Sequence, residues 1–528
     1  MVSSRRQSNA GRRRRASEAP AGRKRKPEEE AVVEEEPQEE GPREVKRRVS
    51  KESEELKPVS HSSHGKTPGQ LFMFGDGDCG QLGLGEDVTE RLRPFPVDVE
   101  SAQVVQVACG GMHTAVLTAV GEIYTWGVND EGALGRETAG ELWEKSGEGS
   151  GNPSDPYVPG LVTLPDSAGR IVQISAGDSH TVALTELGAV WGWGTYRDSS
   201  GVMGFGPHTR MQLTPVLLYQ PKAPGDQVLR VASGADHTAA VTASGHLLTW
   251  GNGQQGQLGR VGERMSDRVK MSTLLMPHPV PFKRSRGVSG RIVDVNCGTY
   301  ATFAVTSDGH IFAFGLNNYG QLALPGLAPV YAPTLVKSLG GKEVAAVRSG
   351  QHHTLAITAT GELLSFGRPT YGRLGQKDAE VGADSACPEP KRVDGLEGVQ
   401  VAGAAAGLAV SGCFDKDGTG WLWGFGTNNQ LGKGDDDSDE VVPHKLAETK
   451  KFSGQRIIQM EFGGQHAALL CVPKGQQQAD GAATAVAAKQ SAADGEQQEQ
   501  GQQLEAVQED VGAVDDDAGD DGEAETFL

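Results

Sequence analysis

Apolar residues alternate with small or polar residues in short runs through the middle of the chain. Stretches such as VVQVACG, RIVQISAG and VLRVASG have a period of two, contain β-branched residues and are bounded by glycine or proline. That periodicity is typical of β-strands, and no repeat unit contains a ten-residue amphipathic helical pattern. The pattern therefore predicts an all-β domain of short antiparallel strands.

Three signals recur in step along this region. An aromatic strand ending in glycine occurs seven times, with spacings of 52 to 67 residues. Gly-x-x-His-Thr followed by alternating apolar residues occurs five times, once with Ala in place of the Thr, and we place degenerate copies at Gly298 and Gly403. GQLG or a variant follows most of the aromatic strands. Repeats of this length are the signature of propellers and solenoids.

Each unit has the signals for about four short strands, and a sheet of that size has two open edges. Radial stacking buries the sheet faces and leaves only short edges, so seven units predict a seven-bladed β-propeller. The repeats open with an aromatic strand at 71–75 and end at 463–472 with a Gly-x-x-His strand that lacks its aromatic partner. We therefore expect the ring to close by pairing of the N- and C-terminal strands.

The net charge of −19 is unevenly distributed, and the composition shifts near residues 66 and 474. Residues 1–66 carry 17 Lys and Arg against 13 Glu, whereas residues 474–528 carry 2 against 14. Both ends have low complexity or dense charge, which predicts disorder. The expected organisation is a basic arm at 1–66, the propeller at 67–473 and an acidic tail at 474–528.

The basic arm contains two dense clusters of positive charge. Their members are Arg12, Arg13, Arg14, Arg15, Arg23, Lys24, Arg25 and Lys26. Such clusters fit a nuclear-import signal, read by an import receptor, combined with an arm that binds nucleic-acid phosphates without reading sequence. A solvated charge run is the alternative.

Several other classes of protein are disfavoured. Six cysteines without CxxC or CxxH spacing argue against a zinc module or a disulfide scaffold and favour a reducing compartment. No apolar window approaches the length of a membrane span, and arginines occupy the place of a signal peptide. We find no Gly-x-Ser-x-Gly, HExxH or Walker pattern, so a hydrolase is a weak alternative. The sequence predicts no metal, no cofactor, no membrane contact and no covalent catalysis.

Residues that recur at one position in nearly every repeat should serve the scaffold. Five histidines belong to this class: His113, His180, His237, His353 and His466. Their separations of 57 to 116 residues match no local metal-ligand spacing. A structural role, with hydrogen bonds to adjacent backbone, is favoured over metal binding.

Residues that differ between equivalent loops are the candidates for function. In the two positions between Gly and His, Asp178, Asp236 and His352 stand out. We expect them to converge on one end of the ring, where propellers commonly bind ligands. Solvated loop charges are the alternative.

Two further loops depart from the repeat. In the third unit a polar and aromatic segment of hairpin character replaces GQLG and predicts a protruding wedge; its residues are Tyr196, Arg197, Asp198, Ser199, Ser200 and Gly201. The fourth unit carries a basic insertion that includes Arg260, Arg264 and Arg268. It predicts either a second contact to phosphate or an acidic surface, or a solvated loop.

Several strings resemble the regulator of chromosome condensation family over residues 67–473: GDGDCGQLGLGE at 75–86, SAGDSHT at 175–181, YRDSSGVMG at 196–204 and SGQHHT at 349–354. The glycine and GQLG pattern alone indicates only the superfamily, which includes propellers of ubiquitin ligases. The resemblance implies a nuclear, chromatin-attached guanine-nucleotide exchange factor for the Ran GTPase. An interaction propeller without exchange activity, such as a ubiquitin-ligase adaptor, is the alternative.

The resemblance also assigns roles to residues. It implies that Asp178, Asp236 and His352 promote exchange, that residues 196–203 push into the GTPase near its nucleotide, and that Asp78 and Arg260 make further contacts. It implies that the basic arm and the loop around Arg264 and Arg268 contact DNA and the acidic face of the nucleosome. The acidic tail, the longer N-terminal segment and an extended loop at 140–160 depart from the family pattern.

Overall fold

The computed structural model describes residues 56–57, 67–100, 102–138, 154–263, 270–282, 287–379, 382 and 385–475. The basic clusters at 12–15 and 23–26 lie outside the described residues. Arg264 and Arg268 do so as well. The roles expected of these residues, and the proposed boundaries of the arm and tail, therefore stay predictions.

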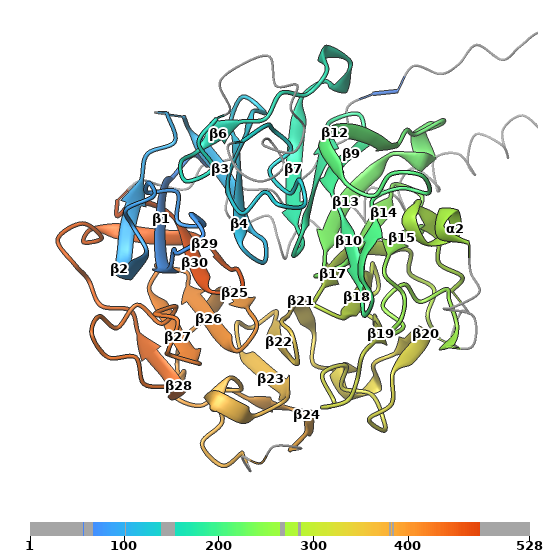
Figure 1. Ribbon diagram of the computed structural model, residues 1–528. Coiled ribbons are helices and arrows are strands. Elements are labelled where there is room, and N and C mark those ends of the chain that lie inside the picture. Colours follow the sequence, from blue (N-terminus) through green and yellow to red (C-terminus); the bar gives the residue numbers. More distant parts are fainter. Residues whose placement is uncertain are drawn as a thin grey trace, which may run out of the picture. The chain divides into compact units, whose positions relative to one another are not determined.

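Seven four-stranded antiparallel sheets are arranged in a ring (Figure 1). Each blade is given from its first to its fourth strand: blade 1 has β3 (Val104–Cys109), β4 (His113–Thr118), β5 (Ile123–Gly127) and β6 (Gly160–Leu161); blade 2 has β7 (Ile171–Ala176), β8 (His180–Thr185), β9 (Val190–Gly194) and β12 (Gln212–Tyr219); and blade 3 has β13 (Val228–Ser233), β14 (His237–Thr242), β15 (Leu247–Gly251) and β16 (His278–Pro279). Blade 4 has β17 (Ile292–Cys297), β18 (Ala301–Thr306), β19 (Ile311–Gly315) and β20 (Val330–Leu335); blade 5 has β21 (Val344–Ser349), β22 (His353–Thr358), β23 (Leu363–Gly367) and β24 (Cys387–Arg392); and blade 6 has β25 (Val401–Ala406), β26 (Val410–Asp415), β27 (Gly420–Gly424) and β28 (Glu440–Lys445). Blade 7 joins the two ends of the chain, with β29 (Gln455–Phe462), β30 (His466–Pro473), β1 (Gln70–Asp76) and β2 (Glu90–Val97). The predicted seven-bladed β-propeller is confirmed.

Within the described residues, few elements lie outside the blades. They are the two-stranded hairpin of β10 (Tyr196–Asp198) and β11 (Gly201–Gly204), the short helix α2 (Met271–Leu275), and the 3-10 turns η1 (Asp166–Ala168), η2 (Pro224–Asp226), η4 (Lys337–Leu339) and η5 (Thr370–Gly372). Among the described residues, none of the helices has the length and apolar character needed to span a bilayer.

The ring closes through its two ends, as the motif order predicts. The first strand, β1, pairs antiparallel with the last, β30, from Gln70 opposite Cys471 to Gly75 opposite His466, and Figure 1 shows the blue β1 beside the red β30. Alternate residues of β1 face opposite neighbours: Phe72 and Phe74 pack into the core shared with blade 6, whereas Leu71 and Met73 pack against blade 1. Both faces of the closing strand are therefore buried, which explains its uninterrupted apolar sequence.

The glycine at the end of each aromatic strand has a conformational reason. All seven have positive φ, between 97° and 118°. At Gly251 an added Cβ would lie 2.5 Å from the carbonyl oxygen of Asp236, in the loop before the second strand. The corresponding glycine Gly367 packs in the same way against the carbonyl of His352. Glycine thus lets the loop that carries each variable residue press against the end of the third strand.

The recurring histidines join neighbouring blades. The Nε2 atom of each is hydrogen-bonded to a hydroxyl in the next blade: His113 with Thr181 (2.9 Å), His180 with Thr238 (3.0 Å), His237 with Thr302 (2.9 Å), His353 with Ser411 (2.8 Å) and His466 with Thr114 (3.0 Å). The hydroxyl of Thr114 donates its one hydrogen to the Gln81 carbonyl of a GQLG loop at 3.0 Å, so the imidazole must be the donor to it. The predicted structural role is confirmed, but its partner is a side chain of the next blade rather than adjacent backbone.

One repeat assignment was wrong. The sixth Gly-x-x-His copy begins at Gly407, not at Gly403, because the Gly407 amide donates to Val410 (2.9 Å) as the Gly110 amide donates to His113 (2.8 Å). Val410 therefore occupies the histidine position. The next blade has Ala467 where others have a hydroxyl, so both halves of the inter-blade hydrogen bond are absent together.

Candidate functional site

The loops between the first and second strands of the blades lie at one end of the ring, which we call the site rim. Backbone hydrogen bonds link these loops around the axis: Asp178 donates to Ala235 (2.8 Å), Ala235 to Thr299 (3.2 Å) and Thr299 to Gly350 (3.1 Å). Asp178, Asp236 and His352 therefore lie on the same rim, in the arrangement that the repeats predict. Their part in exchange stays a prediction.

The two carboxylates interact with each other. Asp178 is exposed, whereas Asp236 is half-buried and accepts a hydrogen bond from the Arg197 amide at 2.7 Å. Burial, and then the negative charge of Asp178, raise the pKa of Asp236 to about 7. Although the Asp178 side chain reaches solvent, the dense packing around its base removes part of its hydration and raises its pKa, an effect that the Arg197 guanidinium opposes. The pair is thus short of positive charge and would gain from a cationic partner.

The predicted wedge is a hairpin that projects from blade 2 and is fixed at its base. The Arg197 guanidinium pairs with Glu131 of blade 1 at 2.8 Å. On the other side, Asn252 donates to the Arg197 carbonyl at 2.9 Å, and the Ser199 amide donates to Gln254 at 3.2 Å. The side chains of Arg197, Ser199 and Ser200 are exposed. The hairpin therefore presents polar groups beside the carboxylate pair.

Tyr196 differs from the rest of the hairpin because its side chain is fully buried. Its ring stacks on Phe205, and its hydroxyl lies 3.2 Å from the hydroxyl of Thr238. In other blades a GQLG carbonyl receives the equivalent hydrogen bond, and the wedge has replaced that loop in blade 2. Tyr196 thus supplies the missing hydrogen-bond partner of Thr238 and anchors the hairpin, while the GTPase contact expected of it stays a prediction.

An aromatic cluster lies farther round the rim. His352 contacts Tyr319 with ring centroids 5.0 Å apart and Tyr300 at 6.4 Å. Arg368 lies over the Tyr319 ring at 4.6 Å. Burial, and then the charges of Arg373 and Arg368, lower the pKa of His352 to about 4. His352 is consequently neutral at pH 7.

The remaining two predicted contacts have different surroundings. Asp78 is exposed, and its charge, together with that of Asp130 in blade 1, helps to raise the pKa of the Cys79 thiol, for which burial is the larger cause. It therefore lies on the site rim near the Glu131 loop. Arg260 instead donates to the Thr249 carbonyl at 3.0 Å within its own blade, as Arg136 does to Thr125 in blade 1. That repetition gives Arg260 a scaffold role, and its contact with a partner stays a prediction.

Sequence reasoning missed four residues of this surface: Glu131, Tyr300, Tyr319 and Arg368. Tyr300 lies close enough to both carboxylates that, after burial, their charges raise its pKa. It occupies the same variable position as Asp236, so the comparison of repeats could have found it. Glu131 and Arg368 follow aromatic strands, in loops whose variable positions were not compared.

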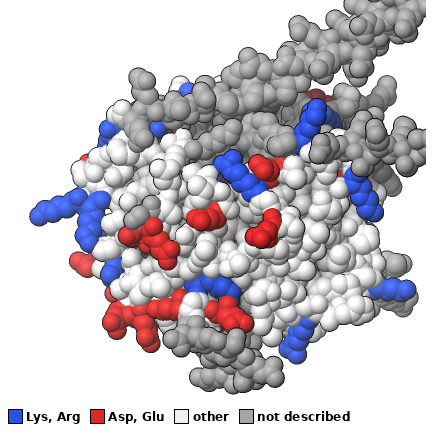
Figure 2. Space-filling view, turned by 90° about the horizontal axis from the view of Figure 1, so that it is seen from above, with Lys and Arg blue, Asp and Glu red and all other residues white. Residues whose placement is uncertain are grey.

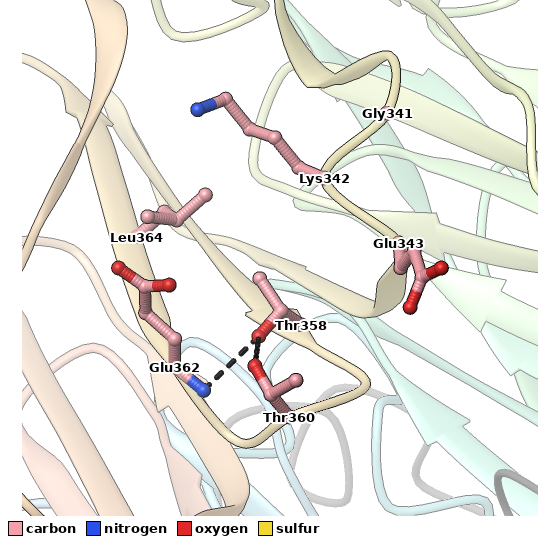
Figure 3. A pocket seen from close by; sticks show the side chains of 7 residues that line it. All are labelled: Gly341, Lys342, Glu343, Thr358, Thr360, Glu362 and Leu364. Atoms are coloured by element: carbon pink, nitrogen blue, oxygen red, sulfur yellow. Dashed lines mark hydrogen bonds between the residues drawn. The ribbon is translucent and has the colours of Figure 1, made fainter.

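The opposite rim holds a pocket of about 300 Å³ at blade 5 (Figure 3). Thr358 and Thr360 lie side by side there, and the Glu362 amide donates to the Thr358 hydroxyl at 3.0 Å. Equivalent turns at Thr118 and Thr242 make the same hydrogen bond. The pocket therefore belongs to the scaffold.

Charged side chains are distributed unevenly on the outer wall. In Figure 2 acidic side chains gather along one edge, while Lys and Arg are scattered. Within the described ranges, His, Cys, Asp and Glu form no cluster of three or more that could hold a metal ion.

The family model of the RCC1-like domain matches residues 70–469, nearly the whole ring. The chain belongs to the RCC1-like domain family. The Regulator of chromosome condensation of Xenopus laevis is 42% identical over 80% of this chain and 94% of that protein. The guanine nucleotide exchange factor SRM1 of Saccharomyces cerevisiae is 29% identical over 75% of this chain and 86% of that protein.

Solved structures of RCC1-like propellers agree with this fold. Prp20p of Saccharomyces cerevisiae superimposes with a TM-score of 0.67 and 27% identity, covering 82% of this chain and 97% of that chain. Its crystal structure was described together with its binding to Gsp1p and histones. The same yeast protein has been solved with Kap60 bound.

Proposed function

We propose that this protein is a guanine-nucleotide exchange factor for the Ran GTPase that acts while attached to chromatin. The observation that carries the proposal is the arrangement of the site rim, where two interacting carboxylates lie at the base of an exposed hairpin. The family relationship and the exchange activity named for a yeast relative support it. The binding of Gsp1p and histones by Prp20p supports the two partners.

Exchange of this kind needs no covalent step. The exchange factor binds the nucleotide-free GTPase more tightly than the nucleotide-bound one. Thermodynamic linkage then requires that the factor lowers the affinity of the GTPase for nucleotide by the same factor as nucleotide lowers its affinity for the exchange factor. A nucleotide held at nanomolar affinity has about 12 kcal/mol of binding free energy. The protein interface must therefore supply a comparable free energy in the nucleotide-free complex.

The residues of the rim suit this task. A basic group of the GTPase would relieve the unfavourable charge at Asp178 and Asp236, a gain available only on binding. Arg197 and the serines of the hairpin would enter the nucleotide region, held in place by Glu131 and Asn252. Neutral His352 would donate or accept a hydrogen bond without adding charge. These interactions would hold the GTPase in the conformation from which the nucleotide dissociates.

The cellular setting follows from the ends of the chain. The basic clusters of residues 1–66 would serve as a nuclear-import signal and a chromatin tether. Kap60 binding by the yeast protein supports an import receptor as a partner. Deleting residues 1–66 should reduce retention on nucleosomes at moderate salt, and unchanged retention would show that the arm is not the tether.

Release of fluorescent GDP from Ran tests the exchange proposal. The wild-type protein should accelerate release, and Asp236→Ala should lose at least about tenfold of that acceleration, since a buried charged contact contributes about 1.5 to 3 kcal/mol. Asp417→Asn is the matched control, because Asp417 is an exposed acid in the β26–β27 turn on the opposite rim. No acceleration by the wild-type protein would leave a non-exchanging interaction propeller as the function.

A further inference from the structure

A basic groove lies on the outer wall of the closing blade. It has a volume of about 400 Å³ and is formed by β2 of blade 7, the loop after Lys433 in blade 6 and the connection from β28 to β29. Four cations line it, namely Arg91, Arg93, Lys450 and Lys451, against a single acid, Asp435. Within the part of the chain that the structure describes, none of these four cations forms an ion pair.

The groove is held open by its own contacts. Phe95 lies between two cations, with the Arg91 guanidinium 4.8 Å and the Lys451 ammonium 3.4 Å from its ring centroid. The Gly434 amide donates to the Leu92 carbonyl at 3.1 Å and fixes the opposite wall. Because Arg91 and Lys451 already rest on an aromatic ring, an anionic ligand would lose less entropy in organising these two cations.

The acidic part of the same chain starts beside this groove. The Lys474 amide donates to the Gly454 carbonyl at 2.7 Å, and its ammonium pairs with Glu448 at 2.6 Å. Lys451 is three residues before Gly454, a reach of at most about 11 Å. The chain therefore leaves the propeller next to the lysines of the groove.

The charge and length of the following residues match the groove. Residues 476–528 contain 14 acids and a single lysine. Seven of the acids fall between Asp515 and Glu525, 40 residues beyond Gly475. A random coil of 40 residues would have a root-mean-square span of about 35 Å, so chain length does not prevent these acids from reaching the groove.

We propose that the acidic segment within residues 505–525 docks in cis on this basic groove and shields it from nucleic-acid phosphates. Tethering gives the segment an effective concentration of about 1 mM, so even a weak individual contact is occupied. Both sides are exposed charges, so raised salt releases the segment. While the acidic segment is docked, nucleic-acid phosphates can bind only to basic residues outside the groove.

Carbodiimide cross-linking of the full chain tests the docking directly, because it joins only amines and carboxylates in contact. Lys450 and Lys451 should give at least about five times as many links to residues 505–525 as the exposed control residues Lys222, Lys342 and Lys377. The excess should disappear in 0.5 M NaCl. Links distributed evenly over all five lysines would overturn the proposal.

Binding of a 20-base-pair DNA duplex tests the shielding. Neutralising seven acids should tighten binding about tenfold; the substitutions are Asp515→Asn, Asp516→Asn, Asp517→Asn, Asp520→Asn, Asp521→Asn, Glu523→Gln and Glu525→Gln. The gain should vanish when Arg93→Gln, Lys450→Gln and Lys451→Gln are added, and persist when Lys222→Gln, Lys342→Gln and Lys377→Gln are added instead. An equal unfolding midpoint of the two triple variants excludes loss of folding.

Two results would contradict the proposal. If the gain persists in the groove variant, the tail covers other cations. If the duplex binds the groove equally with and without tail charge, the groove is a nucleic-acid site that the tail leaves open. Both results are read from cross-linking and DNA binding and not from GDP release, so failure of this proposal is distinguishable from failure of the exchange proposal.

Discussion

Replacing Asp236 by Asn should stabilise the protein in a pH-dependent way. The substitution keeps an oxygen that can accept the 2.7 Å hydrogen bond from the Arg197 amide, but it removes the charge. Burial and the nearby Asp178 raise the pKa of Asp236 from 3.8 to about 7. The folded state therefore holds its proton more tightly than the unfolded state does.

The pH dependence of the unfolding free energy follows from proton linkage. The stability that protonated Asp236 contributes is fully present below pH 3.8 and is lost as the pH rises to about 7. Between pH 5 and pH 8 the wild-type protein loses about 2 to 3 kcal/mol that the Asn variant keeps. Above pH 8 the difference should become constant.

Urea unfolding of both proteins at pH 5, 6, 7 and 8 measures this difference. The gain in unfolding free energy from Asp236→Asn should grow over this range, mostly below pH 7, and should exceed any change caused by Asp417→Asn, which removes an exposed charge. A pH-independent difference for Asp236→Asn would refute the charge argument. A stabilised variant with slower GDP release would show that this acid is retained for function at the expense of stability.

Two further substitutions separate scaffold from contact surface. Tyr196→Phe should cost about 1 to 2 kcal/mol of unfolding free energy, because Thr238 loses its hydroxyl partner. It should slow GDP release less than Arg197→Ala does. If Tyr196→Phe slowed GDP release more than Arg197→Ala, Tyr196 would be a direct contact with the GTPase. Arg260→Leu should destabilise the protein by about 1 to 3 kcal/mol, because the Thr249 carbonyl loses its hydrogen bond from Arg260. Arg260→Gln should be tolerated, since Gln376 makes the equivalent hydrogen bond to the Ser365 carbonyl at 3.0 Å in blade 5. Stable Arg260 variants that still fail to promote exchange would show that Arg260 contacts the GTPase.

Much of the fold could be predicted because its local rules repeat. The strand ending in Gly251 and the Gly-x-x-His loop before His237 recur with the same chemistry, so the number of blades and the closure by β1 followed from counting. The degenerate sixth copy was misplaced at Gly403 because alanine and glycine repeat through residues 402–407. The register there is fixed by the Gly407–Val410 hydrogen bond and by the pairing of β26 with its neighbouring strands.

The candidate site was less accessible to the sequence. Comparison of repeats identified Asp178, Asp236 and His352, which share a rim. It could not show that Tyr196 is buried, because the hydrogen bond that holds its hydroxyl in the core is made to Thr238, 42 residues away and in the next blade. Long-range pairs of this kind leave no local periodicity.

The central claim is that the site rim binds Ran more tightly without nucleotide than with it. The affinity of the protein for Ran, measured by surface binding with and without excess GDP, tests this most directly. We predict stable binding to nucleotide-free Ran, and a loss of affinity with added GDP that equals the factor by which the protein weakens GDP binding. Equal affinity for the empty and loaded GTPase would contradict the account.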